Sequence, residues 1–191
     1  MLDGPIPDGY VEAWSRHFAQ AKAELPRDAE TTVLFRIQQE WFGLPVAVLM
    51  EVVERRPIHS VPHAPSPALL GVVNIRGQLL ICISLARILR MTETSSSAPA
   101  DKTNPERFLI ARTTEGPIVF PVNEVFGVCQ YRTGELRPVP ATVARSDGHF
   151  TRAMLPWARA QVDEAEGEPP VELVGLLDEQ TLFSAVNRGL A

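Results

Sequence analysis

Histidine and cysteine are the residue types in this sequence whose spacing could support metal binding or redox chemistry. His59 and His63 lie four residues apart, but Pro62 between them makes a helix that presents both on one face improbable. A zinc site needs three or four suitably spaced ligands, and the sequence does not supply the remaining partners. Cys82 and Cys129 lie inside apolar, strand-like runs, where free cysteine packs as a small hydrophobe. We therefore expect solvated loop histidines, core cysteines and no metal site.

Hydrolytic and nucleotide enzymes require arrangements that this sequence lacks. A serine hydrolase would carry a Gly-x-Ser-x-Gly elbow, and a nucleotide enzyme would carry a phosphate-binding glycine loop with lysine. An aspartic protease needs two carboxylates, one from each half of the chain, that share a proton. Asp178 closes the second half, but Ser84 stands at the matching place in the first. We expect no catalytic residue and no cofactor.

The elements that position these residues form a duplicated unit. The segment PVAVLMEV begins at Pro45, and its counterpart PVNEVFGV begins 76 residues later at Pro121. Each segment follows an apolar run (TTVLFRI, RFLIART) and precedes a proline-punctuated stretch and a second apolar run (GQLLICISL, VELVGLLD). Short runs of Val, Leu and Ile separated by glycine and proline are typical of small β-barrels. The repeat predicts two copies of one small β unit.

One string, GVVNIRG, occurs only in the first copy. It contains Gly71, Asn74, Ile75, Arg76 and Gly77. The Arg-Gly pair predicts a turn between two strands, and Gly71 and Asn74 are expected to shape that turn. On these residues alone, Arg76 is interpreted as a solvated turn arginine.

The order of these segments resembles the CheW family, the coupling proteins of bacterial chemosensory arrays. The resemblance rests on a strand, an apolar-proline step, a Val-x-Glu-Val-like segment, a proline, the string GVVNIRG and a following apolar strand, and it covers roughly residues 31–188. The chain departs from the family pattern at Leu80 and Ser84, where proline and aspartate are usual. An extended N-terminus also resembles the coupling proteins of Wsp-type surface-sensing pathways.

The resemblance implies a mainly β fold of two tandem SH3-like five-stranded β-barrels. The barrels would pack side by side, strands would pair across the duplication, and a short C-terminal helix over residues 181–190 would complete the fold. The implied function is a non-catalytic coupling scaffold. It would join the regulatory domain of a CheA-like histidine kinase to the cytoplasmic tips of transmembrane, methyl-accepting chemoreceptors.

Two groups of candidate binding residues also follow from the resemblance. Arg76, with Asn74 and Gly71, would lie at the groove that receives the receptor tip, where a guanidinium suits carboxylates and carbonyls. Leu49, Glu51 and Val52 would form a surface for the kinase or the receptor. Core packing is the alternative for Leu49 and Val52, because their counterparts in the second copy are also apolar. Glu51 is matched by a glycine there, so we expect it at the surface.

Composition and charge narrow the range of partners. The 191 residues are 45% hydrophobic, which is enough for a core, and the net charge is −5 with a pI near 5.4. The 18 Lys and Arg residues are spread along the chain, so no basic footprint for nucleic acid is present. No apolar run approaches the roughly 18 to 20 residues that span a bilayer. We expect a cytoplasmic protein, recruited to receptor arrays, that neither binds nucleic acid nor inserts into the membrane.

The chain is expected to divide into an N-terminal extension, residues 1–30, and a CheW-like domain, residues 31–191. The domain would comprise a first barrel (31–91), a linker loop (92–105) and a second barrel with the C-terminal helix (106–191). The spacing of apolar residues over 8–25 predicts an amphipathic helix, which covers a barrel edge or, alternatively, docks on a partner. The acidic run 163–170 is expected to be a solvated loop.

A second hypothesis comes from a different class of protein. A small-molecule-binding or hydrolytic double barrel would have its site in the cleft between the barrels. Such a site should contain a cluster of polar groups with shifted pKa values in the largest pocket. The sequence offers Arg76, Glu51 and Glu54 as candidates, with no nucleophile or base beside them.

Overall fold

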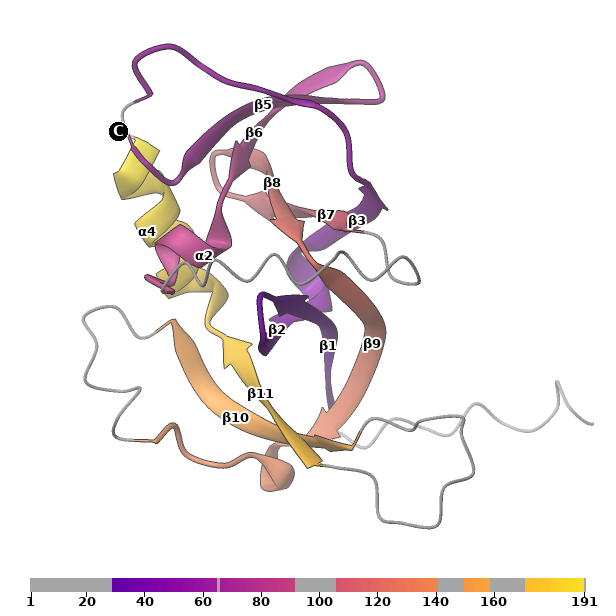
Figure 1. The fold of residues 1–191 in the computed structure, drawn as a ribbon. Helices are drawn as coiled ribbons and strands as arrows, with labels where there is room; N and C mark the ends of the chain where they lie inside the picture. The colour runs from indigo at the N-terminus through magenta and orange to yellow at the C-terminus, as the bar shows by residue number, and fades with distance from the viewer. Residues whose placement is uncertain (1–28, 65, 92–105, 141–149, 159–170, 191) are drawn as a thin grey trace, which may run out of the picture.

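Two β-sheets with few helices make up the part of the chain that the computed structural model describes, residues 29–64, 66–91, 106–140, 150–158 and 171–190 (Figure 1). The strands are β1 (Ala29–Ile37), β2 (Glu40–Pro45), β3 (Leu49–Glu54), β4 (Ile58–His59), β5 (Leu69–Ile75), β6 (Gln78–Ile83), β7 (Arg107–Thr113), β8 (Gly116–Val122), β9 (Glu124–Arg132), β10 (Thr151–Ala158) and β11 (Val171–Leu177). The helices are α2 (Leu85–Ile88), α4 (Glu179–Leu190) and the 3-10 turns η1 (Val46–Val48) and η2 (Thr133–Glu135). The predicted N-terminal helix, the linker 92–105 and the acidic run 163–170 lie outside the described residues.

The two copies of the repeat exchange strands. Sheet 1 has the order β10-β11-β2-β1-β9, and sheet 2 has the order β3-β7-β8-β6-β5-β4. Strand β1 of the first copy pairs with β9 of the second, and β3 of the first pairs with β7 of the second. Each sheet therefore combines strands of both copies, as the resemblance implied. Sheet 2 has one strand more than sheet 1, the two-residue β4.

The registers show that the duplication extends to single residues. In the first copy, β1 and β2 pair Arg36 with Trp41, and in the second, β7 and β8 pair Arg112 with Pro117. The parallel contacts follow the same rule, because β11 runs beside β2 in sheet 1 as β6 runs beside β8 in sheet 2. A register shift also falls at matching places, at Met50 in β3 and at Phe126 in β9. Positions in the two sheets can therefore be compared one by one.

The hydrophobic core has three parts. The largest lies between the sheets and contains Phe35 and Phe120, both fully buried. A second lies within sheet 1, where the rings of Trp41 and Trp157 meet edge to face with centroids 5.1 Å apart. The third lies within sheet 2 and is built mainly from aliphatic side chains around Phe108. The two sheets thus share one core and each keep one of their own.

Both halves end in a helix with a side-chain N-cap. The predicted C-terminal helix is confirmed as α4, which packs near α2 (Figure 1). The Asp178 Oδ1 atom accepts the backbone N–H of Thr181 at 2.7 Å, and the Ser84 Oγ atom accepts that of Arg87 at 3.3 Å. Serine and aspartate are both good caps. The serine at position 84 therefore keeps the capping role of an aspartate.

Side-chain exposure confirms some expectations and corrects one. Leu49 is half-buried against the core between the sheets, Cys82 is fully buried, and the Cys129 side chain is partly buried against the core of sheet 1. The core interpretation of Val52 is wrong, because this residue is 38% exposed. The cause is position: β3 is an edge strand of sheet 2, so its side chains have a neighbouring strand on one side only. Val128, the counterpart of Val52 on the edge strand β9, is exposed too.

Candidate functional site

A two-residue hairpin turn presents Arg76 at the end of sheet 2. Ile75 of β5 pairs with Gln78 of β6, and both residues between them have positive φ, 51° at Arg76 and 87° at Gly77. Two such residues define the type I′ turn, whose twist matches that of the flanking strands. The Asn74 Oδ1 atom accepts the Gly77 N–H at 2.8 Å. The predicted turn and the role of Asn74 in shaping it are confirmed.

Gly71 has a different role from the one expected of it. It lies within β5, not in the turn, and its φ is 141°. A Cβ at this position would lie 2.1 Å from the backbone oxygen of His59 in β4. Only glycine allows this approach, so Gly71 sets the spacing between β4 and β5.

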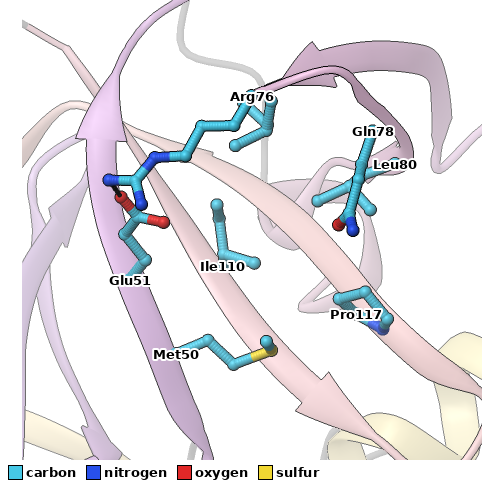
Figure 2. A pocket seen from close by; sticks show the side chains of 8 residues that line it. Met50, Glu51, Arg76, Gln78, Leu80, Ile110 and Pro117 are labelled. Atoms are coloured by element: carbon cyan, nitrogen blue, oxygen red, sulfur yellow. Dashed lines mark hydrogen bonds and ion pairs between the residues drawn. The ribbon is translucent and has the colours of Figure 1, made fainter.

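Arg76 reaches from the turn to β3 and pairs with Glu51 (Figure 2). The Arg76 Nη2 atom donates to Glu51 Oε1, and the two side chains are 78% and 29% exposed. Ion pairs at such exposure contribute only about 0 to 1 kcal/mol to stability. The fold does not depend on this pair, so another carboxylate could replace Glu51 at little cost.

A pocket of about 280 Å³ lies beside this ion pair, and we call it the apolar pocket. Its lining residues come from both copies of the repeat (Figure 2): Met50, Glu51, Ile75, Arg76, Gln78, Leu80, Ile110 and Pro117. Met50 is the residue that the register of β3 skips, and it is 48% exposed. The pocket therefore has a mainly apolar lining beneath a charged rim.

A second pocket of about 430 Å³ adjoins the same turn, and we call it the arginine pocket. It is lined by Arg56, Pro57, His59, Asn74, Arg76 and Gly77. Arg76 thus lines both pockets. His59 and His63 are exposed, as expected. The described residues contain no group of three or more His, Cys, Asp and Glu side chains placed to hold a metal ion.

The predicted site residues do not all meet at these pockets. Arg76 and Glu51 meet at the apolar pocket, and Asn74 lines the arginine pocket. Neither pocket is lined by Leu49, Val52 or Gly71. The sequence alone does not reveal the lining residues of the second copy or the arginine beside Pro57, because local patterns do not specify which strands are neighbours.

The groups whose pKa values are shifted lie away from both pockets. Hydrogen bonds from Arg152 and then from Tyr131 lower the pKa of Glu30, and burial followed by the Glu30 bond raises the pKa of Tyr131 to about 12. Burial also raises the pKa of Cys82 to about 12, and the backbone N–H of Thr181 lowers that of Asp178. These shifts follow from packing, capping and the link between β1, β9 and β10. They do not mark either pocket as a catalytic centre.

The CheW-like domain family model matches residues 31–186 of this chain. This chain belongs to the CheW-like family. A curated relative, the probable chemotaxis protein CheW of Rhizobium etli, is 27% identical over 123 residues, which cover 64% of this chain and 75% of the relative. The family membership supports a non-catalytic coupling scaffold of chemotaxis signalling as the function.

A solved CheW structure has the same fold. The scaffolding protein TtCheW of Thermoanaerobacter tengcongensis superposes with a TM-score of 0.58 at 19% identity, over 84% of this chain and 91% of that one. The two SH3-like barrels expected of a CheW-like domain correspond to sheets 1 and 2. Among the described residues, no helix has both the length and the apolar composition needed to cross a bilayer.

Proposed function

We propose that this CheW-like scaffold couples chemoreceptors to a CheA-like histidine kinase, and that the receptor tip docks at the apolar pocket. The observation that carries the proposal is the apolar pocket itself, with Arg76 and Glu51 at its rim. Apolar anchors set in a pocket commonly dominate the binding energy of such interfaces. The exposed ion pair adds orientation and specificity at the rim.

The partner would act by exchanging contacts at this rim. A carboxylate or carbonyl of the receptor tip can take the place of Glu51 on the Arg76 guanidinium, because the exposed pair contributes little to stability. The receptor can bias the kinase only through contacts that differ between its signalling states. The scaffold therefore needs no catalytic group of its own, and we place it in the cytoplasm at membrane-associated receptor arrays.

The kinase is proposed to bind an adjoining surface, which shares Glu51 with the rim of the apolar pocket. The regulatory domain of a CheA-like kinase resembles this double barrel, so an edge-strand surface such as β3, with Leu49, Glu51 and Val52, is a candidate for contact between homologous barrels. Val52 contributes exposed apolar area there. Interfaces of this transient class correspond to about micromolar Kd, or roughly −8 kcal/mol.

Charge reversal at Arg76 tests the receptor site. We expect Arg76→Glu to weaken binding of a soluble chemoreceptor cytoplasmic fragment at least about 10-fold, equivalent to about 1.4 kcal/mol. The melting temperature should stay nearly constant, because Arg76 is exposed. Arg137→Glu is the matched control, since Arg137 is also exposed but does not line either pocket. Unchanged receptor binding and kinase stimulation by folded Arg76→Glu protein would remove Arg76 from the site.

A further inference from the structure

We propose that the arginine pocket binds a carboxylate side chain, Asp or Glu, of the protein segment that docks on the apolar pocket. The inference rests on the proposed function and adds a second recognition element to it. The partner would present an acidic and an apolar side chain next to each other. Arg56 and Arg76 would hold the carboxylate, and the apolar pocket would hold its neighbour.

Charge is the first argument for this assignment. The six lining residues include two arginines and no carboxylate. Within the described part of the chain, no hydrogen bond or ion pair occupies the Arg56 guanidinium, whereas its neighbour Arg55 is paired with Glu106. Arg76 uses Nη2 for Glu51 and keeps further N–H donors. The pocket therefore offers two guanidinium groups to an anion.

The backbone holds these groups in place. The close approach of β4 to β5 at Gly71 fixes the strand that follows Arg56 and Pro57 against the hairpin. On the other side, Arg76 has a left-handed φ of 51°, a conformation unfavourable for a residue with a Cβ and found most often where the surroundings impose it. Both arginines therefore start from defined backbone positions, which lowers the ordering cost of binding.

The sharing of Arg76 between the pockets favours a protein side chain over a free anion. A free anion would fill the arginine pocket and leave the apolar pocket of about 280 Å³ to water. A segment with adjacent acidic and apolar residues fills both pockets at once. The chain carries a net charge of −5, so an acidic partner is repelled by most of the molecule and is directed to this local positive site.

Substitution of Arg56 tests the site with a soluble cytoplasmic fragment of a chemoreceptor from the same genome. We expect Arg56→Gln to weaken binding about 2- to 5-fold and Arg56→Glu about 10-fold. Both effects should shrink as salt is raised, because the contact is exposed. Arg137→Glu, which changes the same charge elsewhere, should bind as the wild type does.

A second form of the fragment, with the acidic residues of its tip changed to Gln and Asn, completes a double-mutant cycle. The Arg56 effect should disappear against this neutral fragment. Wild-type affinity of Arg56→Glu, or the same loss against both fragments, would overturn the carboxylate site. If Arg76→Glu weakens binding while Arg56→Glu does not, the proposed function stands and this inference fails.

Binding of sodium glutarate provides a readout that does not depend on the receptor. In NMR spectra we expect the side-chain N–H signals of Arg56 and Arg76 to shift with glutarate, while the Arg137 signal stays constant at matched ionic strength. Absence of these shifts would overturn the site even if no receptor fragment binds. Inorganic phosphate that binds about 10-fold more tightly than glutarate would indicate a phosphate site and would also contradict the proposal.

Discussion

Sheets 1 and 2 are built on the same repeat, but matching positions hold different side chains, and the apolar pocket lies in sheet 2. The matching pairs, with the sheet 1 residue first, are Trp41 and Pro117, Trp157 and Ile75, Phe126 and Met50, Gly127 and Glu51, and Ala158 and Arg76. In sheet 1 the Trp157 ring contacts both other aromatic rings, with centroids 5.1 Å from Trp41 and 4.6 Å from Phe126. These rings occupy the region that forms the apolar pocket in sheet 2.

If the proposed receptor site is right, the duplicated fold separates stability from recognition. In sheet 1 these positions hold large aromatic side chains that pack against one another and contribute to the core. In sheet 2 the matching side chains are smaller and leave the apolar pocket open, with the Arg76–Glu51 pair at its rim. Neither set could have been assigned its role from composition alone, because both are apolar apart from Glu51 and Arg76.

The largest expected effect comes from removing an aromatic ring from the core of sheet 1. Trp41→Ala should lower the free energy of unfolding by about 3 to 5 kcal/mol, because a buried aromatic side chain is removed. The matched change Pro117→Ala should cost about 1 kcal/mol or less, since Pro117 lines an open pocket. Denaturant unfolding of both variants measures the difference. Equal losses would show that the two sheets do not differ in the way proposed.

The next largest effect comes from filling the apolar pocket of sheet 2 with a larger side chain. Ile75→Trp places in sheet 2 the residue that occupies the matching position in sheet 1. We expect a stability change within about 1.5 kcal/mol, because the pocket supplies space for the ring, and at least a 10-fold loss of receptor-fragment affinity, about 1.4 kcal/mol. Ile75→Leu, which conserves volume, is the control. Retained affinity in Ile75→Trp would exclude the pocket as the docking site.

Much of this comparison was accessible from the sequence. The alignment of Pro45 with Pro121 located the matching strands, because strands of the two copies share the same apolar pattern. The Arg-Gly pair predicted the hairpin turn, since glycine readily adopts the positive φ that such a turn requires. Asp178 and Ser84 were recognised as counterparts, although their shared capping role became clear only from the hydrogen bonds.

The pairing of strands limited what the sequence could predict. Ile110 and Pro117 belong to the second copy but line a pocket with Met50 of the first, because β3 pairs with β7 across the duplication. The register shift at Met50 and the edge position of β3 likewise decide that Val52 is exposed. These features depend on contacts between distant segments, which local patterns do not encode.

A smaller effect is expected at the two helix caps that close the copies. Asp178→Ala should cost about 1 kcal/mol, and Ser84→Ala about 0.5 kcal/mol, because the Ser84 bond is longer and α2 is short. Thermal unfolding measures both. Ser84→Asp should recover or exceed wild-type stability, as an equally good cap. If Ser84→Ala cost more than Asp178→Ala, the helix of the first copy would be the more important one.

The smallest effect concerns a glutamate at the same place in each copy. Glu30 accepts hydrogen bonds from Arg152 and Tyr131, which lower its pKa below the ordinary value of 4.5, while its counterpart Glu106 pairs with the exposed Arg55. A carboxyl with a lowered folded-state pKa contributes stability above its unfolded pKa and loses it as the pH falls toward the folded value. Because Glu30 is partly exposed, we expect Glu30→Gln to cost at most roughly 0.5 kcal/mol at neutral pH and Glu106→Gln close to nothing. Denaturant unfolding of both variants at neutral pH and at about pH 3 should show that the free-energy cost of Glu30→Gln decreases in acid. A cost that does not depend on pH would mean that the shape of Glu30, and not its charge, is important.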